Sequence, residues 1–163
     1  VGLDVAALAE TLDAAPALVM RRLAVMAEAD LPGPVGFVAC DASGVLTWRR
    51  AMPSFAMPRV GAGCPLWPLY RALARPLTLH AAALRSAASE GPDLRADAIA
   101  VPAGPPAVNR DPLLGAQMLL RPAEPDAPTP SLVVGSACRV CPRAGCPARR
   151  EPSLLPEAGM PAA

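Results

Sequence analysis

The spacing of apolar and polar positions divides the chain into two helical runs followed by several short extended runs. Residues 4–12 carry apolar side chains at helical spacing, and a second helical run covers residues 17–28 after an interruption at 13–16. Pro16 suits the first turn of the second helix. The second run is too apolar to present polar side chains to DNA bases. We therefore expect a helical hairpin that packs or links, in preference to a direct DNA reader.

The extended runs predict a sheet. Runs at 35–40 and 45–50, joined by the turn cluster Asp-Ala-Ser-Gly, are typical of a β-hairpin. A short helix is expected over 66–74. Further strands are expected at 76–82, 97–102, 114–121 and 131–135, with loops at 104–112 and 122–130. Helices followed by strands that enclose one inserted helix indicate an α+β domain with a mostly antiparallel sheet.

The composition fits one globular unit with attached segments. The chain has 163 residues, of which 53% are hydrophobic and 18% charged, which suffices for a buried core. No apolar run reaches the length of a membrane-spanning helix, and no secretory signal is visible, so we expect a cytoplasmic protein without a membrane partner. The expected division is a helical hairpin at 1–30, an α+β domain at 31–150 that includes a Cys-rich segment at 136–150, and a flexible tail at 151–163.

Charge and composition argue against two classes of function. All 15 basic residues are arginines, but the net charge is only +1 and aromatic residues make up 3%, so there is neither a basic footprint nor a stacking platform for nucleic acid. The single histidine, His80, excludes an HExxH zinc site and would have to serve any Ser-His-Asp triad. We expect His80 to be a structural or surface residue. Phosphate loops and dinucleotide fingerprints are also missing, so we do not expect an enzyme.

Three cysteines near the C-terminus have metal-ligand spacing. Cys138, Cys141 and Cys146 follow the pattern Cys-x2-Cys-x4-Cys, which lets neighbouring thiolates converge on one metal centre. A four-thiolate site needs one more ligand. Cys64 is the first candidate because it lies on a Gly-rich loop directly before a predicted helix. Cys40, inside a predicted strand, is expected to be an inert buried thiol and is the reserve.

The sequence leaves the identity of the metal open. Zinc and iron–sulfur clusters both accept four thiolates, and structural zinc sites more often use two Cys-x2-Cys pairs. Proline follows Cys64, Cys141 and Cys146, and Cys-Pro also closes the bacterial ferredoxin motif. The arginines placed to offset the negative charge of a cluster are Arg139, Arg143, Arg149 and Arg150. We favour a [4Fe–4S] cluster, with zinc and a metal-free or disulfide arrangement as alternatives.

Two motifs resemble a known family. Gly-Cys-Pro-Leu-Trp at 63–67, together with Cys-Arg-Val-Cys-Pro-Arg-Ala-Gly-Cys-Pro at 138–147, resembles the C-terminal domain of the short-chain fatty acyl-CoA transcriptional regulator family, which includes the mycobacterial propionate-catabolism regulators. The N-terminal helices and the turn at 41–44 fall where that family has its own, so the resemblance covers nearly the whole chain.

The resemblance implies a cytoplasmic transcription regulator. Its helix-turn-helix DNA-binding domain and a peptidase-like region would lie upstream, so DNA would be a partner only through that upstream part. This chain would then be a GAF-like sensor domain that binds a short-chain acyl-CoA and a [4Fe–4S] cluster. The resemblance makes Cys64, Cys138, Cys141 and Cys146 the cluster ligands.

The expected acyl-CoA contacts are less specific. Arginine holds phosphate groups bidentately, and Arg59 and Arg71 flank the predicted pocket-forming segments, as do Arg49 and Arg50. Trp67 can cover an acyl chain or an adenine ring, although a core role competes for it as for Trp48. We take Arg59, Trp67 and Arg71 as candidate acyl-CoA contacts and consider a homodimer possible. The rival from another class is a structural zinc module that mediates protein contacts without a small-molecule ligand.

Overall fold

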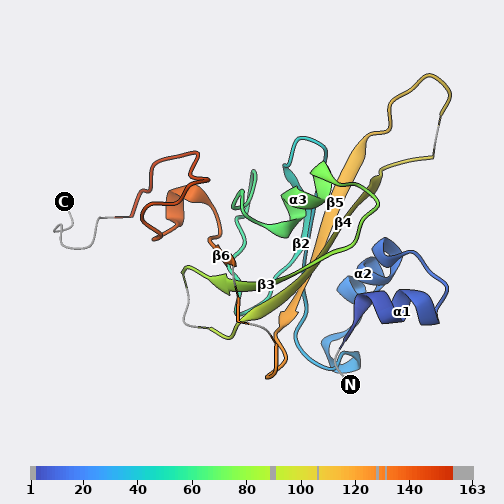
Figure 1. Cartoon of the computed structure of the whole chain (residues 1–163), viewed down its shortest axis with the longest axis horizontal. Helices are drawn as coiled ribbons and strands as arrows, with labels where there is room; N and C mark the ends of the chain where they lie inside the picture. The colour runs from blue at the N-terminus through green and yellow to red at the C-terminus, as the bar shows by residue number, and fades with distance from the viewer. Residues whose placement is uncertain (1–2, 89–90, 106, 128, 131, 156–163) are drawn as a thin grey trace.

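A computed structural model describes most of the chain (Figure 1). The described residues are 3–88, 91–105, 107–127, 129–130 and 132–155. The helices in this part are α1 (Val5–Thr11), α2 (Pro16–Val25) and α3 (Pro68–Ala74), with short 3-10 turns at Glu28–Asp30 and Cys138–Val140. The strands are β1 (Gly36–Cys40), β2 (Leu46–Arg50), β3 (His80–Ser86), β4 (Leu94–Pro102), β5 (Leu114–Pro122) and β6 (Leu132–Val134).

The strands form one six-stranded sheet in the order β2-β1-β5-β4-β3-β6. Neighbouring strands are antiparallel except β3 and β6, which are parallel. The predicted α+β class with a mostly antiparallel sheet is therefore confirmed. The expected β-hairpin at 35–50 is β1 and β2, whose turn is closed by Asp41 Oδ1 accepting from Ser43 N and has Gly44 at a φ of 83°.

Several predicted boundaries were wrong. The strand expected at 76–82 begins only at His80 and continues to Ser86, because Leu77 has a positive φ of 64° and its N–H donates to Ala100 O outside the strand ladder. The strand expected at 97–102 begins earlier, at Leu94. Helix α2 ends at Val25, short of the expected residue 28, because Met26 turns to extended backbone.

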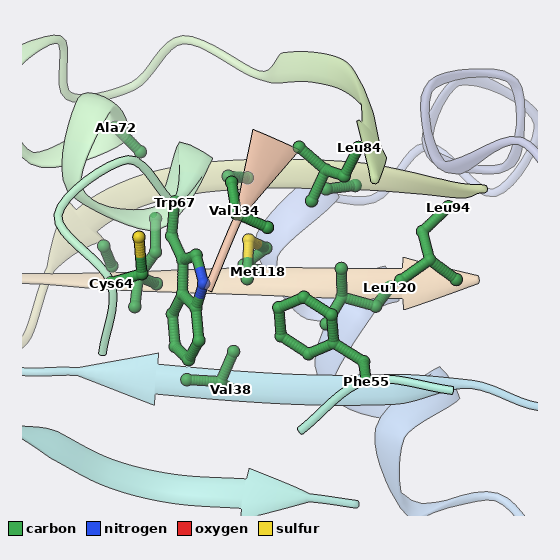
Figure 2. Close-up of a cluster of buried hydrophobic side chains, with 14 of the residues drawn as sticks. Val38, Phe55, Cys64, Trp67, Ala72, Leu84, Leu94, Met118, Leu120 and Val134 are labelled. Atoms are coloured by element: carbon green, nitrogen blue, oxygen red, sulfur yellow. The ribbon is translucent and has the colours of Figure 1, made fainter. Parts of the chain in front are cut away.

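The sheet is buried on both faces. On one face, α3 and the preceding loop cover a cluster that includes Val38, Trp67, Leu84 and Met118 (Figure 2). On the other face, α1 and α2 cover a second cluster, represented by Met20, Phe37, Ile99 and Leu119. Alternation of side chains along β1, β4 and β5 supplies both clusters. Figure 1 places the helical hairpin and the Cys-rich segment at opposite ends of the domain.

Two polar side chains fasten α2 to the sheet. Gln117 of β5 is 2% exposed, and its Nε2 donates to Ala17 O over 2.7 Å while its Oε1 accepts from Arg21 Nε over 3.1 Å. At the other end of the helix, Arg50 Nη1 of β2 donates to three carbonyl oxygens, those of Leu23, Ala24 and Met26, over 3.2, 3.2 and 2.8 Å. A cation that satisfies the last carbonyls of a helix also interacts favourably with the helix dipole.

The helices that the structure describes include none with the length and hydropathy that crossing a membrane requires.

Candidate metal centre

The Cys64 loop is held against the sheet by two aromatic residues that follow it. Gly63 N donates to Tyr70 Oη, and Trp67 N donates to Cys64 O over 3.0 Å, which closes a turn just before α3. A Cβ on Gly63 would lie 2.2 Å from the Trp67 ring, so only glycine fits here. These contacts fix the Cys64 thiol inside the domain, where the residue is 6% exposed.

Trp67 links this loop to the start of the Cys-rich segment. Its side chain is fully buried, and its Nε1 donates to Gly135 O over 2.8 Å. In Figure 2 it lies at the centre of the labelled side chains, with Cys64 on one side and Phe55 on the other. This hydrogen bond fixes the position of Gly135, where the chain leaves β6 and approaches the Cys64 loop.

Cys141 packs against the same glycine. A Cβ on Gly135 would come within 2.7 Å of Cys141 Sγ, and Cys141 itself is only 7% exposed. Burial raises the pKa of the Cys64 thiol, hydrogen bonds from the backbone of Leu66 and Gly135 partly oppose this, and negative charge on Cys141 and Cys138 raises it further. Cys64, Cys138 and Cys141 thus lie within electrostatic reach of one another.

An arginine organises the backbone between these thiols. Arg149 Nη1 donates to Cys138 O over 2.9 Å, and its Nη2 donates to the carbonyl oxygens of Cys141 and Arg143. Arg150 N lies 3.5 Å from Cys138 Sγ, within hydrogen-bonding range of a sulfur acceptor. Of the arginines expected to offset the charge of a cluster, Arg149 and Arg143 bind backbone carbonyl oxygens through their side chains, Arg143 Nη1 donating to Val133 O over 2.9 Å, whereas Arg150 acts through its backbone N–H.

The beginning of the predicted tail also belongs to this segment. Leu154 N donates to Arg139 O over 2.7 Å, and Arg139 lies 3.8 Å from Glu151 in an exposed ion pair. Residues 151–155 thus fold back on the cysteine turn, while 156–163, the rest of the predicted tail, lie outside the described residues.

The cysteine thiols are suitable ligands for a metal, but they do not lie close enough together to surround a single ion. All five cysteines are free, and Cys146 is partly exposed on the same segment as Cys138 and Cys141. Within the described part of the chain, no three His, Cys, Asp or Glu side chains are grouped closely enough to hold a metal ion. The structure thus brings three of the four predicted ligands into one neighbourhood without assembling them.

Cys40 lies elsewhere. It is 3% exposed in β1, and burial, together with the Asp41 carboxylate, raises its pKa to about 11, although a backbone hydrogen bond from Ala116 opposes this. Its position agrees with the expected inert core role.

Arg59, Trp67 and Arg71, the residues expected to contact acyl-CoA, line neither of the two cavities described below. Trp67 is in the core, whereas Arg59 and Arg71 are exposed. Arg59 O accepts a hydrogen bond from Arg49 Nη1. Sequence reasoning missed the roles of Arg49 and Arg50, whose Nη1 atoms donate to backbone carbonyl oxygens.

A mostly apolar cavity of about 430 Å³ lies instead between α2, the β1–β2 turn and the ends of β4 and β5. A second hollow, of about 440 Å³, adjoins the buried guanidinium of Arg121. Arg121 Nε and Arg95 Nε each lie 3.8 Å from a carboxylate oxygen of Asp97, whose side chain is 5% exposed. Burial raises the pKa of Asp97, and the two arginines partly counteract this.

The fold and the thiols define an α+β domain with a cysteine-rich appendage held against its core. No family model matches the sequence, and no curated protein matches it. A solved structure described as a Mycobacterium tuberculosis transcriptional regulator is similar, with a TM-score of 0.74 and 22% identity over 97% of this chain and 51% of that chain. This chain spans about half the length of that regulator, and at this identity the similarity shows a shared fold.

Proposed function

We propose that this chain is the GAF-like, effector-sensing part of a cytoplasmic transcription regulator of the short-chain fatty acyl-CoA regulator family. The observation that carries the proposal is the convergence of Cys64 and Cys141 on Gly135, which joins the two motifs of the family resemblance in space. The fold shared with about half of a transcriptional regulator supports the same conclusion. We propose no catalytic role; His80, the single histidine of the sequence, begins β3.

We propose that Cys64, Cys138, Cys141 and Cys146 hold a [4Fe–4S] cluster. A zinc ion bound at ~2.3 Å by four thiolates draws their sulfur atoms to about 3.8 Å from one another. A four-iron cluster is a larger body whose thiolates stand further apart, so the two kinds of metal site would set different distances between these sulfur atoms. When bound, the cluster would cross-link the Cys-rich segment to the Cys64 loop and add a group that oxidants can degrade.

In this proposal, the helical hairpin carries the signal to an upstream DNA-binding domain. Helix α2 is fastened to the sheet by Gln117 near its start and by Arg50 at its end. Its position therefore depends on the state of the sheet. A ligand alters this position only if it binds two arrangements of the domain with different free energies.

Acyl-CoA binding remains a proposal with Arg59 and Arg71 as the exposed candidates for the phosphates. Trp67 contributes by holding the Cys64 loop, and a direct contact with an acyl chain would require the core to open. The alternative is a structural zinc module without a small-molecule ligand, and the test must distinguish it from a sensor.

The test is a thermal titration of the metal-loaded chain with propionyl-CoA, with CoA alone as control. Specific binding at one hundred times Kd should add about 2.7 kcal/mol to the free energy of unfolding. Arg59→Gln and Arg71→Gln should weaken the response, whereas Arg75→Gln, another exposed arginine near α3, should not. A chain that ignores propionyl-CoA at every concentration would contradict the sensor proposal and favour the structural module.

A further inference from the structure

The cavity beside α2 has the features of a small-ligand site. Its volume of about 430 Å³ lies within the range of about 300–1,000 Å³ typical of ligand pockets. Arg21 of α2 borders it on one side, and the ends of the long β4–β5 hairpin, visible beside that helix in Figure 1, form another wall. Small side chains create the space: Ala39, Ala42, Ala103, Gly115 and Ala116 all line it.

One cation borders this apolar space: Arg21, an exposed residue of α2. Arg21 Nε is held by Gln117 Oε1 at 3.1 Å, and Gln117 is in turn fixed by its bond to Ala17 O. The Nη atoms of Arg21 make no hydrogen bond to any described residue, so this half of the guanidinium is oriented by a buried partner and remains available. A guanidinium presented in this way matches a carboxylate, which accepts two parallel N–H bonds.

The remaining charge of the lining limits the ligand to one negative group. Asp41 also borders the cavity, but its Oδ1 accepts from Ser43 N at 2.9 Å, from Ser43 Oγ at 2.6 Å and from Val45 N at 3.3 Å. These bonds hold the Asp41 carboxylate in its own turn. A second anionic group on the ligand would find no cation and would face this carboxylate, so dicarboxylates and phosphate esters are disfavoured.

The size of the cavity also favours a small ligand with one negative group. At about 30 Å³ per water, the cavity holds on the order of 14 waters, which is far too little for the nucleotide and pantetheine arm of CoA. Val101, Leu113 and Leu114 provide apolar contacts for a hydrocarbon body. We infer that the cavity between α2 and the sheet binds a free monocarboxylate with an apolar body, its carboxylate on Arg21. The inference goes beyond the proposed function, because it requires neither a metal nor CoA.

Isothermal titration of the full chain tests the site with butanoate, hexanoate, octanoate and decanoate. Affinity should rise with chain length until the cavity is filled, and octanamide, which lacks the charge, should bind about tenfold more weakly or worse. Arg21→Met should weaken octanoate by about tenfold or more, while Arg22→Met, at the next exposed position of α2, should leave it unchanged. Ala103→Leu should narrow the cavity and penalise decanoate more than butanoate.

Three results would overturn the inference: no acid binds, octanamide binds as well as octanoate, or Arg22→Met is as damaging as Arg21→Met. Octanoyl-CoA separates this site from the proposed sensor function. If octanoyl-CoA displaces octanoate and depends equally on Arg21, the assignment to a free acid is wrong even though a sensor function survives. If it binds without displacing octanoate, both sites stand. If only the acid binds, the cavity stands and the acyl-CoA proposal fails.

Discussion

Substitution of Gly135 by alanine probes the meeting point of the two cysteine motifs without removing a ligand. The new Cβ would lie 2.7 Å from Cys141 Sγ and 3.0 Å from Cys141 Cβ, whereas carbon atoms normally approach to about 3.5–4.0 Å. The Gly135 backbone does not have a positive φ, so alanine is tolerated locally and the cost comes from displacing Cys141. Overpacking of this kind costs about 1–3 kcal/mol, which lowers Tm by roughly 2–12 °C in a domain of this size.

The assay combines urea unfolding of the metal-free chain with iron and sulfide analysis after anaerobic loading. Gly135→Ala should lose stability and also metal, because a displaced Cys141 no longer faces Cys64. Gly33→Ala is the matched control, since a Cβ there meets nothing within 4 Å. The reasoning is refuted if Gly135→Ala matches Gly33→Ala in both measurements. Lower stability with full metal content would show that Cys141 is packed here but is not a ligand.

Three further substitutions test the contacts that hold the domain together. Trp67→Phe leaves the buried Gly135 carbonyl without its donor and opens a small void, so urea unfolding should report a loss of about 2–4 kcal/mol in the free energy of unfolding. A loss below the error of measurement would show that Trp67 does not hold the Cys-rich segment in place. Arg50→Met removes the cation from the end of α2 and should lower the free energy of unfolding by about 1–3 kcal/mol, with amide hydrogen exchange rising in that helix first. An equal rise in exchange over the whole domain would contradict this role of Arg50. Asp97 has a raised pKa in the folded protein, so the folded state binds the proton of this carboxyl more tightly than the unfolded state does. The stability that this difference provides is complete below the ordinary pKa of about 3.9 and is lost as the pH rises through the folded pKa. Asp97→Asn cannot titrate, so its stability relative to wild type should increase with pH over that window, and a constant or falling difference would show that burial does not dominate.

Local signals predicted the parts of the fold that depend on neighbouring residues. The turn at Asp41 and the proline at the start of α2 act within a few positions, so the β-hairpin and the helical pair were identifiable from the sequence. The edges of β3 and β4 were not, because these strands are rich in alanine, which shows little contrast between a buried and an exposed position. Pairing with neighbouring strands determines where they begin.

The site was partly predictable for a similar reason. Chemistry alone suggested that Cys64 joins the C-terminal cysteines, and the structure places it near two of them. The role of Trp67 depends on a carbonyl 68 residues away, which no local pattern reports. Gln117 did leave a signal, since an amide inside the apolar run of β5 requires a buried partner.

The most direct test of the central claim is the iron, zinc and acid-labile sulfide content per chain of protein purified without oxygen. We predict about four irons and four sulfides, lost in Cys64→Ser and retained in Cys40→Ser, whose thiol is buried away from the Cys-rich segment. One zinc without sulfide would contradict the cluster and make the cysteines a structural site. Loss of metal in Cys40→Ser but not in Cys64→Ser would contradict the proposed ligand set itself.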